Sequence, residues 1–142
     1  MVPVLGRAAD AAETRLFEEA RRVAARAYAP YSGFGVGAVA VGPSGRSHHG
    51  VNVENASYPA GLCAERAALA AMIAAGERQL RCLAVAAGDG SDCLPCGFCL
   101  QALAEFGDGL IVAQTGGALS VLRVRELLTV PFDGREGRSV VE

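Results

Sequence analysis

The chain has 142 residues, of which 51% are hydrophobic and 20% charged, with a formal net charge of −2. These values are typical of one globular domain spanning residues 1–142, and they exclude a disordered chain. The slightly acidic balance disfavours a nucleic-acid partner, which usually requires a basic surplus on one face. The sequence lacks an apolar run long enough to cross a bilayer and an N-terminal apolar segment typical of a signal peptide. We therefore expect a cytoplasmic protein with no membrane partner.

The first predicted element is an amphipathic helix over residues 10–28. Its apolar residues recur at spacings of three and four along the chain, namely Leu16, Ala20, Val23, Ala24 and Ala27. Asp10 or Thr14 can cap its start, and Pro30 bars its continuation. We expect this helix to cover one face of a sheet.

The remaining elements are a β-hairpin followed by alternating helices and strands. We place them at 35–42 and 46–53 (hairpin), 62–75 (helix), 80–88 (strand), 98–107 (helix), 109–115 (strand) and within 120–128 (a short last helix). The composition of GPSG makes it the hairpin turn, and Gly76 ends the second helix. Helical crossovers predict an α/β domain with a mixed sheet whose later strands are parallel. Residues after about 133 are expected to form a loose polar tail.

The cysteines carry the clearest chemical signal. Five cysteines without a secretory signal indicate a reducing compartment, where clustered thiols more often bind metal or act in catalysis than form disulfides. Cys96 and Cys99 form a C-x-x-C motif at the start of a predicted helix, and Cys63 lies at the head of another. Helix dipoles favour ionised thiols at such positions. Three thiolates with one open position are a catalytic zinc arrangement, whereas a structural zinc site is closed by a fourth protein ligand.

Other interpretations of the thiols remain open. A C-x-x-C motif also occurs in redox pairs, although those follow a strand in a different pattern. Cys93 could close a four-cysteine zinc site or belong to an iron–sulfur motif, but the bacterial cluster spacing would need a cysteine where Leu103 stands. Pro95 is expected to turn Cys93 away from the other thiols. Cys82 lies in an apolar strand, so we expect it to be a small buried hydrophobic residue.

Glu65 follows Cys63 by two residues, at the start of the same predicted helix. Water bound to zinc is acidified toward neutral pH, and a neighbouring carboxylate can take its proton and pass it to a leaving group. Taken alone, Glu65 is more simply a first-turn glutamate stabilised by the helix dipole. Its position beside the predicted thiol cluster favours the catalytic role.

Two motifs give the sequence a family resemblance. CAE at 63–65 and PCGFC at 95–99 match the cysteine-ligand form of the zinc nucleoside deaminase signature. Four ordered blocks, AYAPYSGFGVGA, GVNVENASYPAGLCAER, PCGFCLQALAEF and RELLTVPF, resemble the small homotetrameric cytidine deaminases and cover most of residues 27–132. The resemblance implies a three-layer α/β/α sandwich with a mixed five-stranded sheet. It also implies one Zn²⁺ per subunit and a homotetramer with shared active sites.

The resemblance assigns metal and sugar contacts to particular residues. It implies that Cys63, Cys96 and Cys99 hold the zinc while Glu65 shuttles protons. The NVEN block would place ribose contacts on Asn52 and Glu54, and side chains two residues apart on an extended strand point the same way. Without the resemblance, this pair is more simply a polar strand end.

The resemblance also assigns contacts with the base. It implies that Phe34 lines the base pocket and that the backbone around Ala64 and Cys96 binds the base edge. Phe132 would reach a base in another subunit, and Tyr58 would lie at the intersubunit site. As isolated residues, both phenylalanines would instead be interpreted as core residues.

Arg66 is the residue that we expect to offset the thiolate charge. Zinc with three thiolates carries a net charge of about −1, and an arginine donating to a ligand sulfur would restore some Lewis acidity. The family usually has an arginine directly after the last cysteine, where this chain has Leu100, and a smaller residue at the position of Phe98. Paired His48 and His49 match none of the family's blocks and are expected to be exposed rather than metal ligands.

The implied reaction is hydrolytic deamination of cytidine or 2′-deoxycytidine, releasing ammonia, as in pyrimidine salvage. The partner is then a small nucleoside, and no basic channel for a polynucleotide is visible. Leu100 and Phe98 keep open a deaminase of a modified cytosine nucleoside such as blasticidin S. A non-catalytic, zinc-stabilised interaction domain is a further alternative, and it requires a fourth cysteine on the metal.

Overall fold

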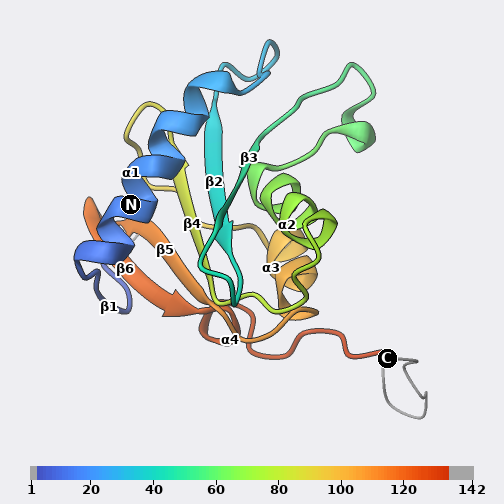
Figure 1. Cartoon of the computed structure of the whole chain (residues 1–142). Helices are drawn as coiled ribbons and strands as arrows, with labels where there is room; N and C mark the ends of the chain where they lie inside the picture. The colour runs from blue at the N-terminus through green and yellow to red at the C-terminus, as the bar shows by residue number, and fades with distance from the viewer. Residues whose placement is uncertain (1–2, 135–142) are drawn as a thin grey trace.

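The computed structural model describes residues 3–134, and within them a six-stranded mixed sheet separates two helical layers (Figure 1). The spatial order is β1-β6-β5-β4-β2-β3. The strands are β1 (Arg7–Ala8), β2 (Val36–Val41), β3 (Ser47–Val51), β4 (Cys82–Ala87), β5 (Leu110–Thr115) and β6 (Ala118–Arg123). The β4–β5 pair is parallel, and every other neighbouring pair is antiparallel. The expected α/β class and the mixed sheet are therefore confirmed.

Helix α1 (Ala11–Val23) covers one face of the sheet. Asp10 caps it, because the Asp10 carboxylate accepts a hydrogen bond from the Glu13 N–H at 2.8 Å while Glu13 accepts one from the Asp10 N–H at 2.9 Å. This reciprocal capping box satisfies two backbone donors at the start of the helix. Of the two expected caps, the structure uses Asp10. The helix gives way to a 3₁₀ turn at Ala24–Arg26, so it ends before the predicted residue 28.

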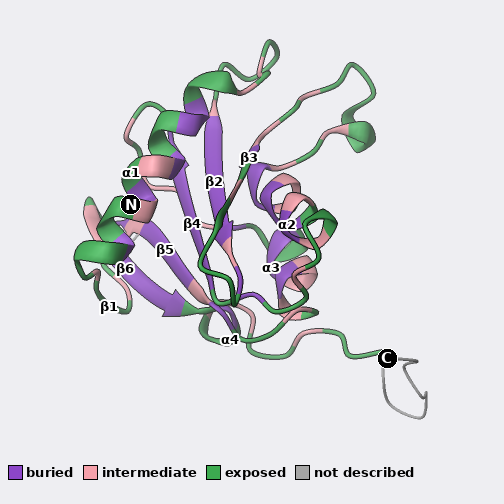
Figure 2. Cartoon of the chain, in the orientation of Figure 1, coloured by how far each residue is buried: buried purple, intermediate pink, exposed green. Residues whose placement is uncertain are grey.

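The opposite face carries α2 (Ala64–Ala74), α3 (Gly97–Ala104) and the single turn α4 (Val124–Leu127). Alternating side chains of β2 divide between the two layers: Val39 packs with the α1 cluster, whereas Ala38 and Ala40 pack with the α2 and α3 cluster. Strand β4 is buried along its whole length, as Figure 2 shows. Its nearly continuous apolar sequence follows from this burial on both faces. None of the helices in residues 3–134 is long and apolar enough to cross a membrane.

The residue patterns predicted four of the six strands and missed β1 and β6, and the sheet has one strand more than the five that the family resemblance implied. Residues 118–123 form β6, whereas the sequence predicted a helix within 120–128 that the structure confines to α4. Gly116 and Gly117 both have positive φ and form a two-residue turn that folds β6 back onto β5. Strand β1 then pairs with β6 through only two residues. The loose tail expected after residue 133 lies almost entirely outside the described residues.

The topology brings the starts of α2 and α3 to one edge of the sheet. Strands β3 and β4 both run antiparallel to β2, so their carboxyl ends point the same way. Helix α2 follows β3 and helix α3 follows β4, so both helices begin near this edge (Figure 1). Ligand sites in open α/β sheets favour this position.

Two glycines allow helices to lie directly against the hairpin. A Cβ on Gly50 would lie 2.2 Å from the Ala68 nitrogen and 2.3 Å from the Ala64 oxygen of α2. A Cβ on Gly37 would lie 2.0 Å from the Ala20 oxygen of α1. Both separations are impossible for a side chain, so these two positions require glycine.

We predict that Gly50→Ala pushes the start of α2 away from β3 and lowers the free energy of unfolding by about 1–3 kcal/mol. Because Cys63 and Glu65 lie at this helix start, zinc affinity should fall as well. Gly37→Ala is the matched control, since it disturbs α1 on the other face and should lower stability while zinc affinity is kept. Urea denaturation and chelator competition measure the two quantities. An equal loss of zinc affinity in both variants would contradict the prediction.

The two histidines of β3 point to opposite faces, and each meets a glutamate. His48 Nε2 lies 2.7 Å from Glu77 Oε2, and both side chains are about 10% exposed. His49 pairs with Glu19 on the α1 side and is 44% exposed. The expectation of an exposed residue is therefore wrong for His48. Glu77 also accepts a hydrogen bond from the Ser44 N–H at 2.7 Å, so it fastens the hairpin turn to the end of α2.

We predict that Glu77 makes the free energy of unfolding depend on pH in the acidic range. The Ser44 N–H and His48 lower the pKa of Glu77 from 4.5 to about 2. A depressed carboxyl pKa contributes stability that is complete above pH 4.5 and is lost as the pH falls through about 2. Wild type should therefore be more stable than Glu77→Gln at pH 6, and the difference should shrink between pH 4.5 and 2 in urea denaturation. A difference that does not change with pH would refute this.

Candidate metal centre and active site

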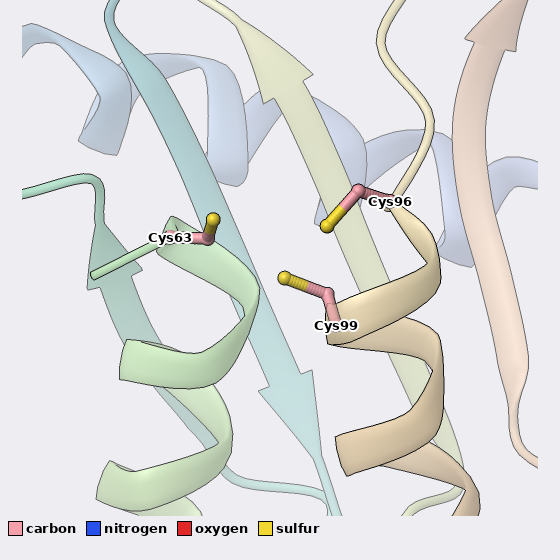
Figure 3. A group of neighbouring side chains, drawn as sticks. All are labelled: Cys63, Cys96 and Cys99. Carbon is pink, nitrogen blue, oxygen red and sulfur yellow. The ribbon is translucent and has the colours of Figure 1, made fainter. Parts of the chain in front are cut away.

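Three thiols converge between the starts of α2 and α3. Cys63 is the N-cap of α2, Cys96 is the N-cap of α3, and Cys99 follows in the first turn of α3. Their sulfur atoms all lie within 4.8 Å of one another, and Figure 3 shows the three side chains directed toward a common point. Tetrahedral zinc with Zn–S bonds of about 2.3 Å places its sulfur ligands about 3.8 Å apart. The three cysteines therefore fit a zinc ion after a small inward movement.

The electrostatics of the thiols also fit a bound cation. Burial acts to raise the pKa of Cys96, but the backbone N–H groups of Cys99 and Phe98 prevail and lower it. Burial, and next the negative charge of Glu65, raise the pKa of Cys99 far above its ordinary value. A divalent cation among the sulfurs would offset both effects at Cys99.

Cys93 does not belong to the group of three sulfurs. Burial raises the pKa of its thiol to about 12, which disfavours the thiolate form. The Cys82 thiol is likewise raised to about 12 by burial within β4. The expectation that Cys82 is a buried, small hydrophobic residue agrees with this position, where it is 9% exposed.

Asp92 anchors the loop that carries Cys96. Its carboxylate accepts hydrogen bonds from the N–H groups of Gly116 at 2.7 Å and Gly117 at 3.0 Å, in the β5–β6 turn. The side chain of Gln114 donates to the same carboxylate at 3.3 Å. Sequence reasoning missed Asp92, because its partners lie more than 20 residues away and belong to a turn that was not predicted.

Glu65 lies in the first turn of α2 and is only 5% exposed. Burial raises the pKa of its carboxyl group, against the opposing effects of its own N–H, Arg66 and Cys99. A raised pKa makes the carboxyl hold a proton more readily, which suits a group that must both accept and return one. Its interaction with Cys99 places it beside the thiol cluster.

Arg66 extends from α2 between a sulfur and an aromatic ring. Its Nη2 lies 4.0 Å from Cys63 Sγ, and its Cζ lies 4.4 Å from the centre of the Phe98 ring. Burial acts against the guanidinium charge, but interactions with Cys63 and Cys99 prevail and raise the pKa of Arg66. Leu100, which stands where the family usually has a second arginine, is 5% exposed and packs in the α2 and α3 core. The structure therefore places one cation against these sulfurs.

Asn52 and Glu54 lie beyond the end of β3, and both support the chain before β2. Asn52 accepts a hydrogen bond from the Val36 N–H and donates one to the Phe34 carbonyl, each at 2.8 Å. Glu54 accepts hydrogen bonds from the N–H groups of Tyr31 and Ser32, at 2.9 and 3.1 Å. Hydrogen bonds from Ser32 are the main cause of the lowered pKa of Glu54. Both side chains therefore bond to the 31–36 segment, and a shared contact with one sugar stays a prediction.

Glu54 also lines a surface cavity of about 390 Å³, which opens between the 31–32 and 54–61 segments. Its other lining residues are Tyr31, Ser32, Asn55, Tyr58 and Gly61. The Tyr31 and Tyr58 rings meet edge to face, with centres 6.2 Å apart. The cavity is large enough for a small organic ligand.

The aromatic residues assigned to substrate contacts are exposed. Phe34 is 38% exposed, Tyr58 is 78% exposed and Phe132 is 80% exposed, so none of them belongs to the core. The side-chain amide of Gln101 holds Phe132 by its backbone, accepting from its N–H at 2.8 Å and donating to its carbonyl at 3.0 Å. Sequence reasoning missed Gln101, although it lies within the PCGFCLQ block. Ala64, by contrast, is fully buried beside Cys63.

Comparisons with known proteins agree with this geometry. A family model for the cytidine and deoxycytidylate deaminase zinc-binding region matches residues 11–115. A cytidine deaminase of Sporosarcina psychrophila is 40% identical over 121 residues, which cover 83% of this chain and 89% of that protein. The crystal structure of cytidine deaminase from Mycobacterium tuberculosis matches with a TM-score of 0.77 and 40% identity, over 87% of this chain and 99% of that one.

The cytidine deaminase structure from Burkholderia pseudomallei also matches with a TM-score of 0.77 and 40% identity, over 84% of this chain and 98% of that one. The regions matched by the family model and by the Sporosarcina relative include the three thiols and Glu65, which lie at the starts of α2 and α3. The chain therefore belongs to the cytidine and deoxycytidylate deaminase family.

Proposed function

We propose that the protein hydrolyses cytidine and 2′-deoxycytidine to uridine and 2′-deoxyuridine, releasing ammonia, as a step of pyrimidine salvage in the cytoplasm. The observation that carries the proposal is a buried glutamate with a raised carboxyl pKa beside a three-thiol group that fits zinc. The names of the relatives support cytidine as the substrate.

In this proposal Cys63, Cys96 and Cys99 hold one zinc ion per subunit. When bound, zinc supplies a water molecule acidified to a pKa of about 7. Glu65 would carry the two protons of the attacking water in turn, one to N3 of the ring and one to the leaving amine. The water oxygen bonds to C4, the C4–N bond breaks and ammonia leaves, so the atoms balance. Burial of Glu65 suits this two-way transfer, because its raised pKa favours the protonated form needed in the second half.

Substrate contacts are proposed from the same edge of the sheet. Glu54 borders the cavity and can contact the ribose, while Asn52 fixes the loop that presents Phe34 to the base. The backbone around Ala64 binds the base edge. Phe132 and Tyr58 are proposed to complete the site of a neighbouring subunit in a homotetramer, because both rings project from the chain with little cover of their own.

The alternative of a modified cytosine nucleoside as substrate depends on Leu100 and Phe98. Leu100 packs in the core and Phe98 covers Arg66, and neither lines the cavity beside Glu54. These positions supply no reason for a bulkier sugar, so we favour the plain nucleosides. The interaction-domain alternative needs Cys93 on the metal, and Cys93 lies outside the group of three sulfurs.

Replacing Glu65 with Gln should lower kcat for cytidine by about 10²–10⁴-fold, because the amide cannot carry the proton. Zinc content should stay at the wild-type level, since Glu65 is not a proposed ligand. Loss of absorbance by the cytosine ring and elemental analysis measure the two quantities. Glu18→Gln, on the exposed face of α1, is the control and should keep full activity. An active Glu65→Gln enzyme with full zinc would refute the mechanism.

The ligand set can be tested with two cysteine variants. Cys96→Ser should lose stoichiometric zinc, because it removes one of three thiolates. Cys93→Ser should keep about one zinc per subunit and remain active. Zinc is measured on the purified protein after dialysis. If both variants lose zinc equally, a four-cysteine structural site replaces the catalytic one.

A further inference from the structure

Phe98 is an exposed aromatic residue in an unusual place. It stands between Cys96 and Cys99 in the first turn of α3, and it is 67% exposed. A large ring in such a position leaves most of its apolar surface in water. The guanidinium of Arg66 lies over it, with the Cζ atom 4.4 Å from the ring centre. That distance is within the range of a cation–π contact.

The ring and the thiols together enclose the Arg66 side chain. Nη2 lies 4.0 Å from Cys63 Sγ, so the guanidinium bridges from the aromatic ring to a proposed metal ligand. The Nε atom is buried and has no hydrogen-bond partner within residues 3–134. Most buried donors in proteins are paired, so an unpaired one calls for an explanation. The Phe98 ring lies over the same guanidinium and contacts the side chain that carries this donor.

Charge makes the position of Arg66 important. Three thiolates and one Zn²⁺ carry a net charge of about −1. Leu100 is apolar and buried, so it supplies no second cation. The single guanidinium must then be held close to the sulfurs and kept from full hydration, because water weakens the attraction between charges.

We propose that Phe98 is a positioning residue, whose ring holds the Arg66 guanidinium against the zinc ligands and shields it from solvent. This inference rests on the proposed zinc site and adds a role that belongs to this chain's own C-x-x-C sequence. Phe98 acts through Arg66 and does not touch the reacting atoms. In this arrangement one shielded arginine provides the charge compensation at the site.

The test is a double-mutant cycle on zinc affinity, measured by chelator competition. Arg66→Gln should weaken zinc binding by about 10–100-fold, the usual effect of losing a partner of a metal ligand. Phe98→Ala should weaken it by about 2- to 5-fold, the effect of losing one exposed cation–π contact. Phe98→Tyr should match wild type because it keeps the ring, whereas Phe98→Leu, which keeps apolar cover but loses the cation–π contact, should lie between wild type and Phe98→Ala.

The decisive comparison adds Phe98→Ala to the Arg66→Gln variant. There, Phe98→Ala should have no further effect on zinc affinity, because the cation that the ring positions is gone. In turnover assays, Phe98→Ala should lower kcat while KM stays near the wild-type value.

Three outcomes would overturn the proposal. These are unchanged zinc affinity in Phe98→Ala, an equal effect of Phe98→Ala with and without Arg66, or full restoration by Phe98→Leu. The second outcome, together with a smaller assembly in gel filtration, would assign the ring to a subunit interface instead. If wild type itself binds no zinc, the proposed function fails first, so the two failures are distinguishable.

Discussion

The fold has to hold several acidic groups together in one place. Three thiols lie close together beside the Glu65 carboxyl, and burial, followed by the negative charges of Glu65, Cys63 and Cys96, raises the pKa of Cys99. At the start of α3, the N–H groups of Phe98 and Cys99 act in the opposite direction and favour the Cys96 thiolate, and Arg66 places a full positive charge beside Cys63. A bound divalent cation would supply the positive charge that is still needed to balance the thiolates and the Glu65 carboxylate.

The order and direction of the strands bring the three thiols and Glu65 together. β3 and β4 run the same way on either side of β2, so the two helices that follow them start at one edge. Gly50 lets α2 lie almost on the backbone of β3, which fixes the depth of Cys63 and Glu65. Asp92 ties the second thiol loop to the β5–β6 turn. A close backbone contact thus fixes one thiol segment, and a side-chain tie to a turn holds the other.

Sequence patterns predicted the parts of this structure that are local. Hydrophobic spacing predicted α1, the hairpin and β4, and the C-x-x-C spacing predicted that Cys96 and Cys99 act together, because each signal lies within a few neighbouring residues. Cys63 is distant in sequence, and its place at a predicted helix start and the family resemblance assigned it to the same group. Strand β6 was missed, since its SVLRV sequence suits a helix or a strand equally well and the two preceding glycines decide. Asp92 and Gln101 were missed because a hydrogen bond across 20 or more residues leaves no local pattern. The exposure of Phe34 and Phe132 likewise follows from topology and not from their chemistry.

Gln101 has a consequence for how this molecule can change over evolution. Its side chain hydrogen-bonds to the main chain of residue 132, so these bonds do not depend on which side chain stands there. The backbone at residue 132 would keep these two hydrogen bonds with a different side chain at that position. A ring, a branched aliphatic chain or a polar group could be offered at the same spot without rebuilding the scaffold. The side chain at position 132 can therefore change without loss of the hydrogen bonds that hold its backbone in place.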